Sequence, residues 1–522
     1  MIRSILSSFV IAKTCSNPRE LIKRGLMPKF VRKSAKLAKA EKSKTTKKLK
    51  KDLSLKKPNI ARPPQSHLEY RNPLASRYAS QSMLHIFSEF RRAEIWRELW
   101  ILLASEEKNL GLPIEDSQIQ AMKKVKSQID FNRVRDWERK THHDVMSHVK
   151  AFGELAPAAE PIIHLGATSC FVTDNADVLI MREATQLILK KLYACLEILA
   201  RRSNTWKALA MTGYTHFQPA QPVTLGKRLA LWAQDLIWDF EEFEFGLTRL
   251  RPLGCKGATG TQASFLVLFN GDFKKVKALD EAICRSLGFT EPVALSGQTL
   301  SRKQDCWFLQ ACANLAASFS KISYDFRLLQ HTGELREPFG KKQIGSSAMA
   351  YKRNPVLAER MTSLARLVIN FSHNATWTFG TQWLERSLDD SANRRVVLPE
   401  TFLATDALLE IFYRLIIGME ADTKKISEST QLYQTFFETE EAMMHGTLGG
   451  GSRQELHERI RQKTMSGKMA AQSKTSKKKI FVGAADKQVD AFLNDKFAEF
   501  VKRSKKSYAN AKSSKLFQSD QI

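Results

Sequence analysis

Three long segments with helical periodicity most constrain what this chain can fold into. They cover residues 177–203, 224–250 and 303–330, and shorter segments of the same kind cover 356–370 and 397–418. Each of the three is about twice as long as the helix of roughly 11 to 12 residues that is usual in globular proteins. Several carry apolar residues on more than one face, which a helix exposed on one side would not need. The pattern predicts an all-α fold with a central bundle of long helices that other subunits complete.

The chain has 522 residues, more than one hydrophobic core usually serves, so several domains are expected. The sequence shows no sustained alternation of apolar and polar residues, which is typical of strands. It also contains no uncharged apolar run of about 18 residues, which a membrane span needs. The predicted parts are listed in chain order. They are a basic low-complexity leader over 1–65, an N-terminal helical domain over 66–168, the long-helix bundle over 169–421 and a C-terminal helical region over 422–522.

The net charge of +28 is concentrated at the two ends of the chain. Residues 1–65 carry a net charge of +16 and residues 463–522 a net charge of +9, which leaves about +3 for residues 66–462. Blocks of like charge often serve as interaction tails, which makes RNA binding by the ends one interpretation. The other is that both ends are solvated tails without a partner. The body of the protein is nearly neutral.

The first residues, MIRSILSSFVIAKTCSNPR, contain no acid until Glu20 and mix arginine, serine and apolar residues as organellar presequences do. A basic leader without a targeting role is the alternative. The seven cysteines form no CxxC pair, so they predict neither a zinc site nor a disulfide framework, and a reducing compartment fits best. We therefore expect a cytoplasmic protein, with mitochondrial targeting by the leader left open.

Short polar segments, most of them containing glycine, connect the predicted helices. In a bundle such connections gather at the ends, and functional residues concentrate on loops that rigid elements hold. These segments supply a histidine, hydroxyls, arginines, a lysine and amides, and the chain shows neither a P-loop nor a dinucleotide fingerprint. The combination predicts an acid–base enzyme without a cofactor that acts on a multiply anionic substrate. The segments are 164–175, 212–224, 256–265, 296–303, 344–355 and 385–395.

The same motifs also have structural interpretations. Thr173 or Asp174 is expected to cap the helix that follows the first polar segment, and the aspartates of 385–395 are suited to internal salt bridges with its arginines. His143 and His148 are five residues apart, not the four of a zinc-binding helical pair, so no metal site is expected.

The stretch IGSSAMAYKRNP at 344–355 resembles the signature loop of the fumarase/aspartase superfamily. With HDVMSHV, HLGATS, THFQPAQ, GTQASF and LDDSANRR in the expected order, the chain resembles the eukaryotic adenylosuccinate lyase family over about three quarters of its length, from 70 to 461. The resemblance implies a homotetramer with active sites shared between subunits, and a carbon–nitrogen lyase (EC 4.3.2.2) that needs no cofactor. It implies release of fumarate from adenylosuccinate, giving AMP, and from the succinyl-carboxamide ribotide SAICAR, giving AICAR, in purine nucleotide biosynthesis.

Carried over residue by residue, the resemblance implies that Ser346 is the general base and His216 the general acid. Lys352 and Asn354 would close over the carboxylates of the succinyl group. The other substrate-binding residues that it implies hold the nucleotide and the succinyl group. They are Arg77, Tyr78, His143, Asp144, Thr168, Ser169, Gln298, Arg360, Arg386, Ser391 and Arg395.

The chain departs from the family pattern in two places. Ala350 stands where the signature loop has proline, which removes a fixed φ and adds an N–H group. After Gln462, roughly 35 to 40 family residues are replaced by a basic linker. Two alternatives to the lyase stay open: an inactive relative with a structural or RNA-associated role, and a sister enzyme that releases fumarate from another adduct, such as argininosuccinate lyase.

Overall fold

The computed structural model describes residues 68–467, 480–509 and 516–517. The predicted leader over 1–65 and most of the basic linker after Gln462 lie outside these residues. The chain divides into two compact units, Met1–Arg71 and Asn72–Ile522, and the account below concerns the second. None of the helices in the described part of the chain is both long and apolar enough to cross a membrane.

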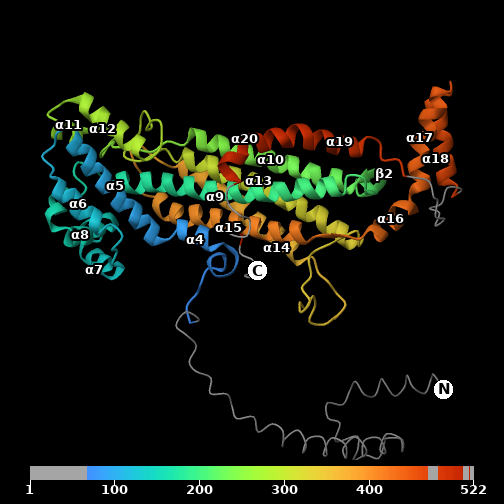
Figure 1. Ribbon diagram of the computed structural model, residues 1–522, viewed down its shortest axis with the longest axis horizontal. Helices are drawn as coiled ribbons and strands as arrows, with labels where there is room; N and C mark the ends of the chain where they lie inside the picture. Colours follow the sequence, from blue (N-terminus) through green and yellow to red (C-terminus); the bar gives the residue numbers. More distant parts are fainter. Residues whose placement is uncertain (1–67, 468–479, 510–515, 518–522) are drawn as a thin grey trace, which may run out of the picture. The chain divides into compact units, whose positions relative to one another are not determined.

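The second unit is built around long helices that lie side by side (Figure 1). They are α9 (Ser169–Thr205), α10 (Leu225–Arg249), α13 (Lys303–His331), α14 (Val356–Gly380) and α15 (Asp390–Gly418). Helix α9 packs against α10 and α15, and α13 packs against α10, α14 and α15. The predicted all-α class with a central bundle of long helices is confirmed. Both α14 and α15 are longer than the periodicity of the sequence indicated.

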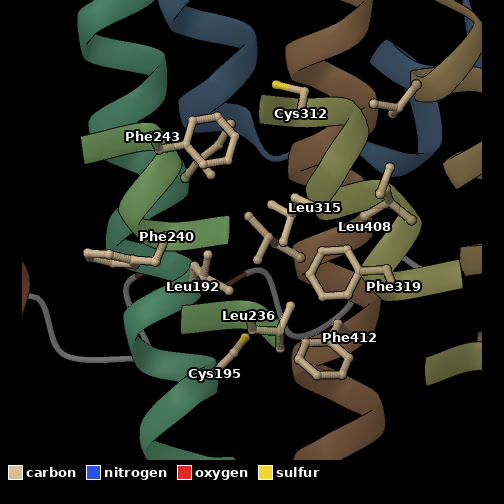
Figure 2. Close-up of a cluster of buried hydrophobic side chains, with 14 of the residues drawn as sticks. Leu192, Cys195, Leu236, Phe240, Phe243, Cys312, Leu315, Phe319, Leu408 and Phe412 are labelled. Atoms are coloured by element: carbon tan, nitrogen blue, oxygen red, sulfur yellow. The ribbon is translucent and has the colours of Figure 1, made fainter. Parts of the chain in front are cut away.

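Large apolar side chains from four of these helices fill the bundle. Figure 2 shows them meeting between the helices: Leu192 and Cys195 on α9, Leu236, Phe240 and Phe243 on α10, Cys312, Leu315 and Phe319 on α13, and Leu408 and Phe412 on α15. The ring centroids of Phe319 and Phe412 lie 4.8 Å apart. Burying each such side chain stabilises the fold by roughly 1.5 to 3 kcal/mol. The bundle is therefore a rigid frame for whatever its ends carry.

A buried group of three charged side chains also lies inside the bundle. The Nζ atom of Lys191 is 2.5 Å from Asp406 Oδ1 and 2.5 Å from Glu410 Oε1. The second oxygen of Asp406 accepts a hydrogen bond of 2.7 Å from the backbone N–H of Ser80. Buried charges are tolerated only when they are paired and hydrogen-bonded in this way. The group fixes the position of α9 along α15.

A second apolar core lies at one end of the bundle, where Trp100, Phe152 and Phe265 are fully buried. Elements on the N-terminal side of α9 supply most of it, together with two helices inserted between α10 and α13. The N-terminal elements of the unit are η2 (Leu74–Tyr78), α4 (Gln81–Ile86), α5 (Glu89–Asn109), α6 (Asp116–Lys124), α7 (Phe131–Thr141), α8 (Asp144–Leu155) and η3 (Pro157–Ile162), and the inserted helices are α11 (Ala263–Leu268) and α12 (Phe273–Ser286).

The C-terminal part continues as shorter helices. They are α16 (Thr423–Leu432), α17 (Gln434–Leu448), α18 (Arg453–Met465), α19 (Ala485–Phe492), η4 (Leu493–Phe497) and α20 (Ala498–Tyr508). Helix α19 returns along α10, and the Phe500 ring of α20 lies edge-on to Phe240 at 5.0 Å. The predicted domain boundaries after residues 168 and 421 stay predictions.

Two short antiparallel pairs of strands are present that the sequence analysis did not predict. Strand β1 (Ala210–Thr215) pairs with β2 (Gln218–Thr224), and β3 (Leu335–Arg336) pairs with β4 (Glu420–Ala421). The first pair was missed because Pro219 and Pro222 interrupt the pattern in β2. Proline is tolerated there because each strand of a two-stranded pair is an edge strand, with one side free of ladder hydrogen bonds.

Glu107 on α5 carries a buried carboxyl group in the second core, and neither of its oxygens has a hydrogen-bond partner among the described residues. Burial raises the pKa of Glu107 from 4.5 to about 8. The folded protein therefore holds this proton more tightly than the unfolded chain does. The stability that follows from it is complete below about pH 4.5, falls between 4.5 and 8, and is lost above pH 8.

We expect Glu107→Leu to remove the loss of stability that the parent protein shows as the pH rises. Between pH 5 and pH 9 the free energy of unfolding of the variant, relative to that of the parent, should rise by on the order of 4 kcal/mol. Urea unfolding at pH 5, 7 and 9 measures it, with Glu106→Leu on the same helix as the matched control. Parallel pH profiles for the parent and Glu107→Leu would show that Glu107 is ionised in the folded protein.

Candidate active site

A cavity of about 940 Å³ lies where α8, α9 and α15 begin. Seven of the predicted substrate-binding residues are part of its wall: His143, Asp144, Ser169, Gln298, Arg386, Ser391 and Arg395. Thr168 is next to them, as the N-cap residue of α9. The structure thus brings together predicted residues from four segments that are far apart in the sequence.

Three helix N-termini meet at this cavity. Asp144 is the first residue of α8, Ser169 of α9 and Asp390 of α15. The first N–H groups of a helix have no partner within it, and they carry partial positive charge, so a helix start attracts anions. The cavity is therefore suited to a ligand with several negative charges.

The prediction that Thr173 or Asp174 caps α9 is wrong. Helix α9 begins earlier, with Thr168 as an extended N-cap residue (φ −112°, ψ 168°). Gly166 has a φ of 67°, which ends the preceding turn and lets the helix start directly after it. This earlier start is what puts Ser169 in the first turn of the helix, at the cavity.

His143 connects the starts of α8 and α9. Its Nδ1 accepts a hydrogen bond of 3.2 Å from the backbone N–H of Met146, as the N-cap of α8. The proton of the neutral ring is therefore on Nε2, which lies 3.5 Å from Ser169 Oγ. The imidazole presents an N–H donor at the cavity wall.

Buried arginine–aspartate pairs hold the frame of the cavity. Arg302, at the N-cap of α13, donates from Nη1 to Asp174 Oδ2 at 2.9 Å and from Nε to Asp390 Oδ2 at 2.7 Å. Burial opposes the charge, but the aspartates outweigh it and raise the pKa of Arg302 above its usual value. A second buried group of the same kind joins Arg394 to Asp177 at 2.8 Å and to Asp305 at 2.7 Å. Together they fix the starts of α9, α13 and α15 relative to one another.

Arg386 differs from these arginines in what it contacts. Its Nη1 lies 2.6 Å from Gln298 Oε1 and 2.8 Å from Cys170 Sγ, both uncharged acceptors. Arg395, in contrast, pairs with Asp144 at 2.8 Å. The sequence analysis did not single out Cys170, although this residue lies in the polar segment 164–175. It missed Arg302 as a site residue although this arginine lies in one of the polar segments singled out, 296–303.

The predicted acid, His216, lies far from this cavity within one chain. It forms the tip of the β1–β2 hairpin with Phe217, and both residues have positive φ values of 52° and 57°. Two residues of this kind make the type I′ turn that joins tight hairpins. The cavity is at the start of α9 and the hairpin follows its end, and α9 is roughly 55 Å long at 1.5 Å per residue. Figure 1 shows β2 and helices α5 to α8 at opposite ends of α9.

The predicted base, Ser346, lies in the loop that precedes α14. Its Oγ accepts hydrogen bonds from the backbone N–H groups of Ala348 at 3.3 Å and Met349 at 3.1 Å. Asn354 Nδ2 donates to the carbonyl of Gly345 at 3.0 Å, and a Cβ on Gly345 would collide with the Lys352 carbonyl oxygen. The loop is closed on itself, and only glycine fits where its two ends meet.

This loop is also separated from the cavity within one chain. Helix α14 lies between the loop and the segment 385–395, and it is roughly 37 Å long at 1.5 Å per residue. The remaining predicted site residues are not part of the cavity wall either. Arg77 and Tyr78 are in η2, which packs against α15, Lys352 is exposed in the loop, and Arg360 is on α14.

Comparisons with known proteins identify the family. Residues 77–370 match the protein-family model described as Lyase. The adenylosuccinate lyase of Saccharomyces cerevisiae is 47% identical over 395 residues, which cover 75% of this chain and 82% of that protein. The chain belongs to the adenylosuccinate lyase family. The adenylosuccinate lyase of Schistosoma mansoni is 44% identical over 429 residues, 82% of this chain and 88% of that protein.

Membership in this family confirms the predicted carbon–nitrogen lyase class, EC 4.3.2.2, and the predicted place in purine biosynthesis. Among solved structures, a fumarate lyase from Mesorhizobium sp. BNC1 has a TM-score of 0.70 at 21% identity, covering 82% of this chain and all 100% of that chain. The 3-carboxy-cis,cis-muconate lactonizing enzyme from Pseudomonas putida has a TM-score of 0.67 at 23% identity, covering 84% and 99%. At these identities the likeness shows the fold alone.

Proposed function

We propose that this protein cleaves adenylosuccinate to AMP and fumarate, and SAICAR to AICAR and fumarate, by acid–base elimination without a cofactor. The observation that carries the proposal is the cavity at which three helix starts meet beside Arg386 and His143, in a member of this family. Both substrates carry a phosphate and two carboxylates, and such ligands suit helix N-termini and arginine.

Ser346 is the proposed general base, which removes the proton from the carbon beside a succinyl carboxylate. A neutral serine is a poor base, so the side chain must act as an alkoxide. The N–H groups of Ala348 and Met349 donate to Ser346 Oγ, and hydrogen bonds to a charged form favour that form. Closure of the loop over the substrate then excludes water and strengthens these interactions.

The charge that develops next needs stabilisation, and the leaving nitrogen needs a proton. Lys352 and Asn354 belong to the same loop and are the proposed groups that stabilise the extra negative charge on the carboxylate. His216, at the hairpin tip, is the proposed acid that protonates the nitrogen as the bond to carbon breaks. Such proton transfer typically contributes about 10² to 10⁴-fold to the rate.

These groups serve one substrate only if several chains build each site. Reacting groups must lie within a few ångströms of the substrate, whereas α9 and α14 separate the cavity from the hairpin and from the loop within one chain. Exposed apolar residues occur at every seventh position of α10, at Leu231, Trp238 and Phe245, and this spacing suits packing against another helix. We infer a homotetramer with shared active sites and, from the cysteine usage, a cytoplasmic location.

The test is a turnover assay on the purified full-length protein without a tag. Adenylosuccinate, SAICAR and argininosuccinate are supplied side by side, and fumarate release is measured by chromatography. We expect release from the first two, and from argininosuccinate at most about 1% as fast, because a site whose polar groups bind a phosphate discriminates strongly against a substrate that lacks it. Absence of turnover together with salt-sensitive RNA binding would favour the inactive relative.

A further inference from the structure

Two uncharged side chains, Gln298 and Cys170, hold the guanidinium of Arg386 in position. Arg386 lies on the segment 385–395, where its side chain is exposed, so its position depends on the groups it contacts. Gln298, one of these groups, is itself fixed by a hydrogen bond of 3.0 Å from its backbone N–H to the Glu385 carbonyl and one of 3.2 Å from Nε2 to the Ala258 carbonyl. A Cβ on Gly297 would collide with the backbone of Glu385, so the two segments are in close contact here. The amide is therefore a rigid support for the guanidinium.

Cys170 is the second residue that holds Arg386 in position. Its side chain is buried, with 1% of its surface exposed, and its Sγ lies 2.8 Å from Arg386 Nη1 and 3.8 Å from Gln298 Oε1. Burial, followed by the nearby charge of Asp174, raises the pKa of the Cys170 thiol to about 12. The thiol is thus uncharged at any working pH.

Because the two groups that hold Arg386 are uncharged, the positive charge of Arg386 can interact with a ligand. The buried arginines of the frame pair with aspartates, which compensate their charge within the protein. A thiol and an amide accept the hydrogen bonds of Arg386 without compensating its charge. A guanidinium that is fixed in position but not neutralised is what an anionic ligand group needs.

We propose that Cys170 is a positioning residue of this enzyme, which together with Gln298 holds the guanidinium of Arg386 ready for an anionic group of the substrate. The proposal rests on the proposed function of the same cavity. Cys170 acts through Arg386 and takes no part in proton transfer. Its loss therefore affects the binding of the substrate and leaves the chemical step nearly unchanged.

The test compares Cys170→Ala and Cys170→Ser with the parent protein. For Cys170→Ala we expect KM for adenylosuccinate to rise about tenfold and kcat to change less than about threefold, since one hydrogen bond to a charged group is lost. Cys170→Ser restores an uncharged acceptor and should recover most of the loss. Calorimetric Kd values for AMP and for succinate show whether Arg386 serves the phosphate or a carboxylate, and one of them should rise about tenfold in Cys170→Ala.

Cys312→Ala is the matched control, because Cys312 is equally buried on α13 but lies in the apolar core of the bundle. It should leave KM and both Kd values unchanged, and thermal unfolding of both alanine variants separates a loss of stability from a loss of positioning. Parent values of KM and of both Kd in Cys170→Ala would overturn the proposal, as would no recovery in Cys170→Ser. A parent protein that binds AMP but has no turnover refutes the proposed function, while the Kd values still decide the role of Cys170.

Discussion

Replacing Ser346 by alanine is expected to lower kcat for adenylosuccinate at least about 10³-fold, the size of effect expected when a base that acts in the transition state is lost. The KM should change little, because in the proposed mechanism Ser346 Oγ takes the proton from carbon and does not bind the anionic groups of the substrate. Steady-state kinetics of fumarate release measure both constants. Circular dichroism and the oligomeric state of the variant show whether the fold is kept.

The neighbouring Ser347 gives a control for this experiment. It carries the same hydroxyl in the same loop, is exposed, and has no assigned role. We expect Ser347→Ala to retain at least about a third of the parent kcat, because surface substitutions usually have small effects. A folded Ser346→Ala variant with more than about a tenth of the parent rate would assign the base to another residue.

The fold was largely predictable from the sequence, because the long helices bury apolar residues at a regular spacing. The exceptions have local physical causes. The first turns of α15, from Asp390 to Arg395, form part of the cavity wall and the buried ion pairs, so they are polar and show no apolar periodicity. The sequence pattern therefore did not predict that residues 390–396 are helical. Strand β2 was not predicted because its prolines interrupt the pattern typical of strands.

The candidate site was predictable in its chemistry but not in its arrangement. The polar segments supplied the types of side chain that an anionic substrate needs, and seven of the predicted residues share one cavity. The partner of each arginine could not be predicted, since pairing depends on how α9, α13 and α15 pack over long range. Arg302 and Arg386 look alike in the sequence, yet the first is neutralised by buried aspartates and the second rests on a thiol and an amide.

Two inactive variants are expected to form an active enzyme when they are mixed. Within one chain α14 separates the Ser346 loop from the cavity, and α9 separates the cavity from His216. If Ser346 and His216 reach one substrate from different chains, a hetero-oligomer of Ser346→Ala and His216→Ala contains some sites with both side chains intact. With random assembly from equal amounts, about a quarter of the sites are intact, so the mixture should regain about a quarter of the parent activity.

Co-expression of the two variants with different affinity tags, followed by purification over both tags, yields the hetero-oligomers for this measurement. Each variant alone, prepared in the same way, should show less than about 1% of the parent activity, as expected when an acid or base is lost. The matched control pairs Ser346→Ala with a chain that carries both substitutions. This pair cannot supply Ser346 from any chain, so it should stay inactive. Hetero-oligomers of the two single variants that remain inactive would show that Ser346 and His216 act from the same chain, and the assignment of these two residues to different chains would have to be abandoned.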